Sequence, residues 1–144
     1  MNLSLLDKAF FLKKTQFFGS LDLDLLLILA EKAEPLSFKK DETIFSAQSE
    51  THRMYLIVDG EVLVELQKDS PFLLRRGECF GDEALFSQRI HRYRAYCQCN
   101  TLLLVLLRSH ILSLIEQSPT FACSLLEMYT DKIPFRHRVQ PKAS

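Results

Sequence analysis

The stretch MYLIVDGEVLV, residues 54–64, decides the fold class of this chain. Residues 54–58 are all apolar or aromatic, and Asp59-Gly60 follows them. Residues 61–66, EVLVEL, are again mostly apolar and include the β-branched Val62 and Val64. An Asp-Gly pair between two such runs is among the strongest short-range signals for a β-hairpin. We therefore expect two antiparallel strands that pair around Gly60.

A second informative stretch is RGECFGDEALF, residues 76–86. Its two glycines mark turns, and residues 83–87 have the composition of a short helix. Alternating apolar and polar residues from Tyr93 to Cys99 predict a half-buried strand, and the continuous apolar run 102–107 predicts a buried one. Shorter strands are expected around residues 36–38, 44–45 and 71–74. Many short strands in sequence favour a sandwich, barrel or jelly roll.

Helical periodicity is confined to the two ends of the chain. Apolar residues recur at helical spacing in residues 4–16 and 21–33, with Ser20 or Asp22 as the N-cap of the second helix. Two more helices are expected at 108–116 and 120–132. Helices segregated from a run of strands indicate an α+β fold: a jelly-roll-type β-roll of about eight short antiparallel strands, flanked by N- and C-terminal helices.

The chain is expected to form one domain over residues 1–133. Its parts are N-terminal helices within 4–33, a β-roll over 35–107 with a short helix at 83–87, and C-terminal helices within 108–132. Residues 134–144 are a polar, basic tail that we expect to be frayed. The basic side chains of this tail are Arg136, His137, Arg138 and Lys142.

Composition excludes several classes of protein. The 144 residues are 47% hydrophobic and carry 18 basic and 18 acidic side chains, which argues against disorder and against a dedicated nucleic-acid binder. The apolar run 21–30 is interrupted by Asp22 and Asp24 and is too short for a membrane span. The four cysteines have no disulfide-scaffold spacing, so a cytoplasmic protein with reduced thiols is expected.

The two stretches together resemble the cyclic-nucleotide-binding domain family, which includes catabolite activator proteins, regulatory subunits of cAMP-dependent kinase and cyclic-nucleotide-gated channels. Residues 54–64 match the family's hairpin pattern Y-L-I-x-x-G-x-V. Residues 77–85 match its pocket pattern G-x-x-F-G-E-x-A-L, which the family follows with P-R-x-A. The resemblance covers about residues 5–130. It implies a non-catalytic regulatory module that binds cAMP or cGMP.

The resemblance also implies a site. The family holds the cyclic phosphate where a short helix starts, since free N–H groups and the helix dipole face the anion there. Gly81 occupies that position, and Asp82 or Glu83 corresponds to the acid that binds the ribose hydroxyl. Asp82 as a simple N-cap is an equal alternative. The implied ligand-binding residues are Phe80, Gly81, Asp82, Glu83, Ala84, His91, Arg92, Arg94 and Ala95.

The segment that should supply the phosphate-binding arginine departs from the family pattern. Placed without gaps, His91 falls on the arginine position and Tyr93 on the small residue. A loop two residues longer instead matches Arg94-Ala95 to the pattern. His91 binds an anion only when protonated. Arg89, His91, Arg92 and Arg94 otherwise form a solvated basic loop.

Two turn glycines of the family are also replaced, by Asp41 and by a residue near Gln48. Asp adopts left-handed backbone conformations moderately well and Gln poorly.

The sequence gives little support to catalysis or metal binding. Cys97-x-Cys99 with His91 has the wrong spacing for zinc, and both thiols are expected to face the core. No G-x-S-x-G elbow occurs. The remaining histidines, His52, His110 and His137, are scattered, which argues against a metal-dependent jelly-roll enzyme. We therefore expect no catalytic residue, no metal and no cofactor.

Two functions remain. The first is a sensor that binds a cyclic mononucleotide and signals to a partner chain. The alternative is a degenerate member of the fold that binds no nucleotide and acts as a protein-interaction module. Too few residues follow position 117 for a DNA-binding domain, so the output should pass to an effector protein or through self-association. The amphipathic helix 120–132 can serve as a lid, as a dimer seam or simply as packing.

Overall fold

The structure is a computed structural model that describes residues 2–66, 70–87 and 90–133. Two four-stranded antiparallel sheets form a β-roll, with strand orders β1-β8-β3-β6 and β2-β7-β4-β5. The helices are α1 (Leu5–Lys13), α2 (Leu23–Lys32), α3 (Glu83–Phe86), α4 (Arg108–Gln117) and α5 (Pro119–Lys132). The strands are β1 (Glu34–Phe38), β2 (Thr43–Phe45), β3 (Arg53–Asp59), β4 (Glu61–Glu65), β5 (Phe72–Arg75), β6 (Cys79–Phe80), β7 (Arg94–Cys97) and β8 (Thr101–Leu107). This architecture confirms the jelly-roll-type prediction.

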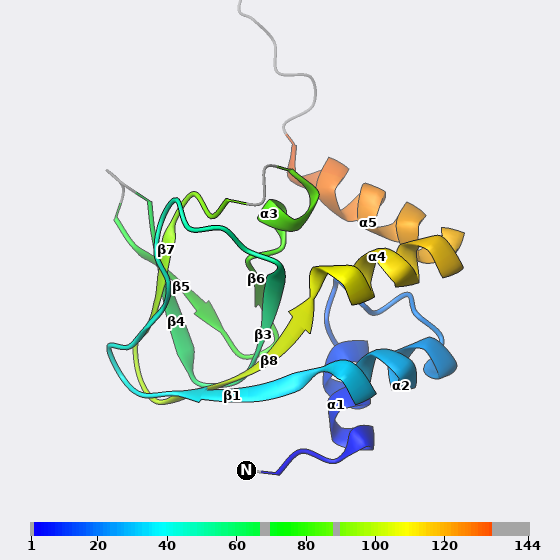
Figure 1. The fold of residues 1–144 in the computed structure, drawn as a ribbon, viewed down its shortest axis with the longest axis horizontal. Coiled ribbons are helices and arrows are strands. Elements are labelled where there is room, and N and C mark those ends of the chain that lie inside the picture. Colours follow the sequence, from blue (N-terminus) through cyan, green and yellow to red (C-terminus); the bar gives the residue numbers. More distant parts are fainter. Residues whose placement is uncertain (1, 67–69, 88–89, 134–144) are drawn as a thin grey trace, which may run out of the picture.

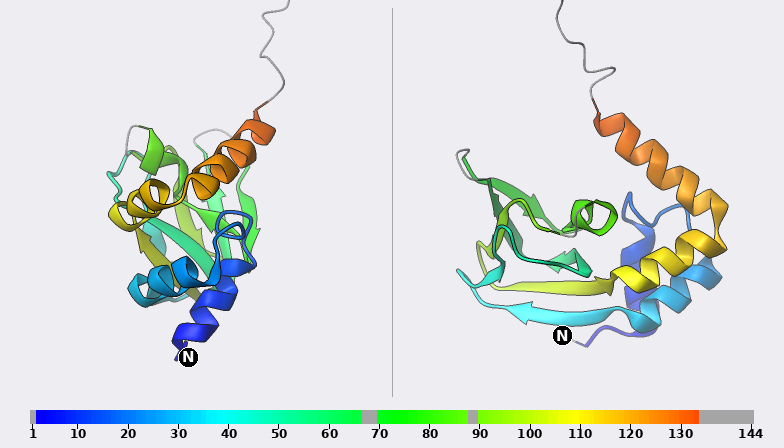
Figure 2. Two further views of the ribbon diagram at one scale, coloured as in Figure 1. Left: turned by 90° about the vertical axis from the view of Figure 1, so that its right-hand side faces the viewer. Right: turned by 45° about the horizontal axis from the view of Figure 1, so that its top comes forward.

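The N- and C-terminal helices gather at one end of the roll (Figure 1). Helix α2 leads into β1, and β8 runs directly into α4, so both helices are anchored to the same sheet. The short helix α3 connects β6 to the segment before β7, on the side of the roll that α5 approaches (Figure 2). This arrangement places α3 between the interior of the roll and the C-terminal helix.

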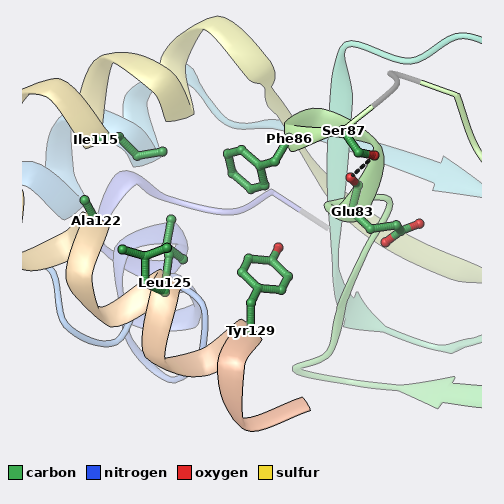
Figure 3. A pocket seen from close by; sticks show the side chains of 8 residues that line it. Glu83, Phe86, Ser87, Ile115, Ala122, Leu125 and Tyr129 are labelled. Atoms are coloured by element: carbon green, nitrogen blue, oxygen red, sulfur yellow. Dashed lines mark hydrogen bonds between the residues drawn. The ribbon is translucent and has the colours of Figure 1, made fainter. Parts of the chain in front are cut away.

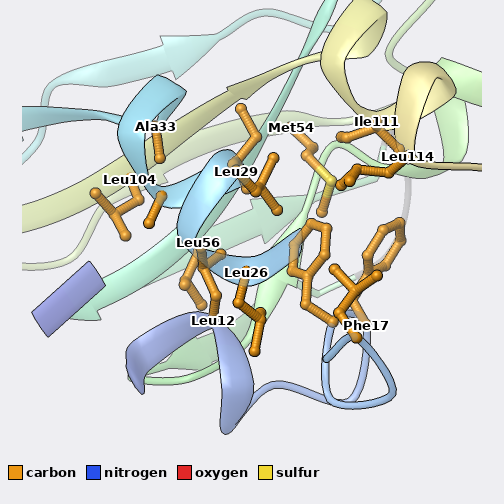
Figure 4. Packing of buried hydrophobic residues seen from close by; sticks show 14 of the residues in the cluster. Leu12, Phe17, Leu26, Leu29, Ala33, Met54, Leu56, Leu104, Ile111 and Leu114 are labelled. Carbon is orange, nitrogen blue, oxygen red and sulfur yellow. The ribbon is translucent and has the colours of Figure 1, made fainter. Parts of the chain in front are cut away.

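The continuous apolar runs of β3 and β8 are explained by burial on both faces of their sheet. Successive side chains of a strand point to opposite faces. In β3, Met54 and Leu56 pack against the helices while Tyr55 and Ile57 point between the two sheets. Figure 4 shows Met54, Leu56 and Leu104 among residues of α1, α2 and α4. The roll therefore has a large core under the helices and a smaller one between its sheets.

The predicted hairpin around Gly60 is wrong, although both strands are present. Strand β3 pairs with β6 and β8, whereas β4 pairs with β5 and β7, so the two strands belong to different sheets. Gly60 has φ +102, and a Cβ there would lie 2.5 Å from Thr101 Oγ1. Asp59-Gly60 thus carries the chain from one sheet to the other, because close packing on Thr101 and the tertiary pairing of β8 override the local turn preference.

The helix ends follow the expected capping chemistry. Asp22, rather than Ser20, caps α2 by accepting a hydrogen bond from the Leu25 N–H at 3.1 Å. Ser118 caps α5, whose first residue is Pro119. Among the described helices, none is long and apolar enough to cross a membrane. The predicted basic tail lies outside the described residues.

The two residues that replace the family's turn glycines adopt the left-handed backbone conformation that glycine favours. Asp41 has φ +70 and Gln48 has φ +68. The turn at Gln48 is held by its N–H, which donates to the His91 carbonyl at 2.7 Å. The predicted inward orientation of both Cys97 and Cys99 is half right: Cys97 is buried, whereas Cys99 lies beyond the end of β7 and is partly exposed.

Candidate functional site

The candidate site is the turn between β6 and α3. Gly81 follows Phe80 with φ +80, and a Cβ at this position would lie 3.3 Å from the Tyr55 ring and 3.4 Å from His91 Cε1. Both the left-handed conformation and the crowding favour glycine. The turn therefore brings backbone close to side chains from β3 and from the segment before β7, as the sequence predicted.

The Gly81 N–H already has a partner within the chain. It donates to the Tyr93 hydroxyl at 2.8 Å. Ala95, which follows on β7, is fully buried. Burial raises the pKa of the Tyr93 phenol, and the neighbouring Glu83 raises it further, so the hydroxyl stays protonated. The Gly81 N–H is therefore bonded to a neutral side chain of the same chain.

His91 points inward, as predicted, but it cannot serve as a cation. Its side chain is 1% exposed, and its ring stacks on Phe45 with centroids 3.4 Å apart and planes 8° apart. Burial lowers the pKa of His91 to about 4, and Nδ1 has no hydrogen-bond partner. The imidazole is therefore neutral at pH 7 and behaves as a packed ring.

The arginines of the predicted clamp are directed elsewhere. Arg94 donates to Thr43 Oγ1 at 3.1 Å, and its guanidinium lies 4.2 Å from the centroid of the Tyr96 ring. Arg92 is exposed. Arg89 lies outside the described residues. The structure does not place Arg94 beside Gly81, because Arg94 alternates with Ala95 and Cys97 on β7 and points away from the buried face of the strand. The expectation that Arg92 or Arg94 joins Gly81 in a phosphate site stays a prediction.

The two acids of the turn have separate environments. Asp82 stands at the N-cap position of α3, but its side chain makes no capping hydrogen bond; it accepts a hydrogen bond from the Tyr129 hydroxyl of α5 at 2.5 Å. Glu83 Oε1 is buried without a partner, and burial raises the pKa of this carboxyl. The N-cap interpretation of Asp82 holds for its position, while its carboxylate links the start of α3 to α5. Sequence placed Tyr129 beside the apolar stripe of α5, but nothing in the pattern identified Asp82 as its partner.

Aromatic rings fill the space between the sheets next to Gly81. Phe80 is stacked on Tyr55 at 5.1 Å between centroids, and Phe45 lies 6.0 Å from Phe80 and 5.3 Å from Tyr93. The smaller predicted site residues, Ala84 and Ala95, are both fully buried. Of the predicted site residues, the structure brings together Phe80, Gly81, Asp82, Glu83, Ala84, His91 and Ala95. This group, with Tyr93, forms a packed interior.

On the opposite side of α3 lies an apolar groove toward α5 (Figure 3). Its volume is about 470 Å³. Phe86 of α3 and Tyr129 of α5 face each other across it with ring centroids 6.0 Å apart. The described residues contain no cluster of histidine, cysteine and carboxylate side chains suited to a metal ion. The groove is one of several hollows near the turn: a second, of about 300 Å³, is lined in part by Gly77, Cys79 and Asp82, and a third, of about 410 Å³, in part by Phe45, Tyr55 and His91.

The chain belongs to the cyclic nucleotide-binding domain family, whose model matches residues 35–118. No match is found among the curated proteins. Solved structures with this fold include the sensor domain of the transcriptional regulator DNR from Pseudomonas aeruginosa, with a TM-score of 0.81 and 15% identity. That alignment covers 94% of this chain and 99% of that one.

Two further similar structures come from longer chains. The catabolite activator protein of Thermus thermophilus is 22% identical with a TM-score of 0.72, and the match covers 82% of this chain and 58% of that one. The regulatory domain of Toxoplasma gondii PKA with cAMP is 16% identical with a TM-score of 0.70, covering 76% and 43%. These comparisons confirm the fold and the expected family.

Proposed function

We propose that this chain is a non-catalytic regulatory module that keeps the cyclic-nucleotide-binding fold, binds no cyclic nucleotide and acts by contact with other proteins. The observation that carries the proposal is the hydrogen bond from the Gly81 N–H to the Tyr93 hydroxyl. This N–H is the donor that the fold would offer to a cyclic phosphate. A ligand would have to displace the partly buried Tyr93 side chain to reach it.

The electrostatics of the turn support the same proposal. An arginine–phosphate pair is one of the strong charge-assisted contacts in proteins. Among the described residues, Asp82 and Glu83 stand at the turn, His91 is neutral, and Arg94 is bound to Thr43. A phosphate placed beside Gly81 would meet two carboxyl groups, which is unfavourable in a poorly solvated interior.

The structures of similar proteins are consistent with a regulatory role. The similar structures include a sensor domain, an activator protein and a kinase regulatory domain. The output of such a module passes to another chain, either an effector protein or a second copy joined through α5. The exposed apolar side chains of Phe86 and Leu126, beside the groove, offer a surface for that contact.

The proposal is tested by calorimetric titration of the full chain with cAMP and with cGMP. The regulatory domain of Toxoplasma gondii PKA serves as the positive control for cAMP. We expect no saturable heat and no shift of the unfolding temperature at millimolar nucleotide. Saturable binding in the micromolar range would overturn the proposal and establish a nucleotide sensor.

A further inference from the structure

Two acidic side chains stand next to each other at the start of α3. Asp82 is 9% exposed, and its Oδ2 accepts the hydrogen bond from the Tyr129 hydroxyl of α5 at 2.5 Å. Glu83 is the next residue, and its Oε1 is buried without a hydrogen-bond partner in the described part of the chain. One acid therefore links α3 to α5, while its neighbour is buried with an oxygen atom that has no donor.

The neutral groups around this pair come from three parts of the fold. Tyr93, before β7, and Tyr129, on α5, both stay protonated, because burial and the neighbouring acids raise the pKa of each phenol. Burial also raises the pKa of the Cys79 thiol on β6, so this group is neutral as well. These phenols and this thiol add no charge that would balance an ionised Glu83.

Two bases approach the same region. The Lys132 ammonium of α5 lies over the Tyr129 ring, 5.5 Å from its centroid. Arg108 of α4 donates from Nε to the Leu85 carbonyl at 2.8 Å, at the other end of α3. Within residues 2–66, 70–87 and 90–133, neither base forms an ion pair with Glu83. The charge of this carboxyl is therefore left without a direct partner when it ionises.

The end of α5 covers the acidic pair. Asp82, Met128 and Lys132 line the same hollow, and Met128 is the last residue of α5 that is buried in the core. Thr130 and the residues after it are exposed. The last turn of α5 can therefore move away from α3 while Met128 and the earlier part of the helix stay packed.

Protonation of Glu83 decides how costly this cover is. Burial raises the pKa of the Glu83 carboxyl; the Tyr93 hydroxyl partly opposes this shift, and Asp82 adds to it. In water the group would titrate near about 4.3. Above that pH a covered Glu83 keeps its proton, whereas a Glu83 reached by water loses it. Rising pH therefore favours the state in which water reaches the pair.

We propose that Asp82, Glu83 and Tyr129 form a pH-sensitive latch for the last turn of α5. With Glu83 protonated, Tyr129 is bonded to Asp82 and the turn is docked on α3. With Glu83 ionised, two adjacent carboxylates lie in a poorly solvated turn, which is unfavourable, and the end of α5 moves away to let water in. The Glu83 carboxyl points away from Tyr129, so its charge acts through Asp82 (Figure 3). The latch needs neither a nucleotide nor a partner chain.

The test is an NMR titration of the full ¹³C-labelled chain between about pH 4.5 and 8. It follows the side-chain carboxyl carbon of Glu83 and the ring of Tyr129. We expect both signals to change with one shared midpoint, above about 4.3. The ratio of open to docked α5 ends should rise by about tenfold for each pH unit between that value and the midpoint.

Two variants assign the response to one side chain. Glu83→Gln is neutral at every pH, so the Tyr129 ring should stay docked and show no inflection. Glu127→Gln is the matched control, because Glu127 is an exposed acid of the same helix, and it should leave the inflection unchanged. Circular dichroism and the unfolding temperature check that both variants fold.

Three results would overturn the proposal. These are a Glu83 midpoint at its ordinary value of about 4.3, a Tyr129 ring signal that stays constant over the titration, or the same inflection in Glu83→Gln as in the wild type. The first two come from the wild-type chain alone, so the proposal can fail even where a variant does not fold.

Discussion

The two sides of α3, one toward the interior of the roll and one toward α5, differ in how closely side chains pack against them. On the inner side, Tyr93, His91 and Phe45 pack beside Gly81, and the turn's N–H is bonded to a side chain of the same chain. On the outer side, Phe86 and Leu126 border an open apolar groove. The fold is common to the whole family. Here aromatic rings pack against the turn on the inner side, where a hollow of about 410 Å³ lined in part by Phe45, Tyr55 and His91 remains, whereas the outer side is an open apolar groove. The position of the side chains around a shared turn, rather than the fold, decides which side can bind a partner.

The largest expected effect is the difference in unfolding free energy between replacing a buried leucine and replacing an exposed one. Leu56 is fully buried in the core under the helices, so Leu56→Ala should lower the free energy of unfolding by about 2–5 kcal/mol. Leu126→Ala should change it by less than about 0.5 kcal/mol. Urea unfolding of both variants measures the difference. A large loss for Leu126→Ala would mean that the groove is a covered part of the core.

The second prediction concerns pH and the inner side. Burial lowers the pKa of His91 to about 4, against about 6.5 in an unfolded chain. Between pH 6.5 and 4 the His91 imidazole is protonated in the unfolded chain but stays neutral in the folded protein. The free energy of unfolding should therefore fall as the pH drops from 6.5 to 4. The loss attributable to His91 should reach up to about 3 kcal/mol.

His91→Leu serves as the comparison for this pH dependence. The raised pKa of Glu83 acts in the opposite direction, since its protonation favours the folded state. The difference between wild type and His91→Leu across pH 4–6.5 therefore isolates the imidazole. Parallel curves for the two proteins would show that His91 is solvated and free to take a proton.

The third prediction tests the hydrogen bond that closes the inner side. Tyr93→Phe leaves the Gly81 N–H without its acceptor, so the free energy of unfolding should fall by about 1–3 kcal/mol. Tyr96→Phe is the matched control, because its hydroxyl is 3.5 Å from Glu65 Oε2 and contributes little. Equal unfolding curves for the two variants would contradict the closing role of Tyr93.

The smallest expected effect lies at the end of the groove. Tyr129→Phe removes the hydrogen bond between α5 and Asp82 and should cost about 1 kcal/mol, because the pair is only partly buried. Thermal unfolding measures the loss. A change of several kcal/mol would indicate that this contact, rather than packing around Phe121, holds α5 in place.

The fold could be predicted from the sequence because burial leaves a clear pattern. The apolar runs at 54–58 and 102–107 correspond to strands buried on both faces, and the helical spacing of both ends agrees with α1, α2, α4 and α5. The separation of β3 and β4 into different sheets could not be predicted. Asp59-Gly60 has the chemistry of a hairpin turn, but sheet membership depends on the long-range pairing with β8.

The position of the candidate site could be predicted from the sequence, but the side-chain contacts within it could not. The motif at residues 77–85 identified the turn, and the glycine proved necessary at Gly81. The contact from Tyr93 depends on the path of the loop before β7, and the sequence left open whether His91 or Arg94 matches the arginine of the family pattern. The contact from Tyr129 joins residues 47 positions apart, and no local pattern encodes such a distance.

The central claim is that the inner side of α3 is closed to cyclic nucleotides, and the Gly81 amide reports on it most directly. Two-dimensional NMR of the ¹⁵N-labelled chain, with millimolar cAMP or cGMP added, follows this single N–H. The account predicts a slowly exchanging Gly81 amide whose resonance does not move with either nucleotide. A saturable shift of that resonance with either nucleotide would show that the phosphate displaces Tyr93 and would contradict the account.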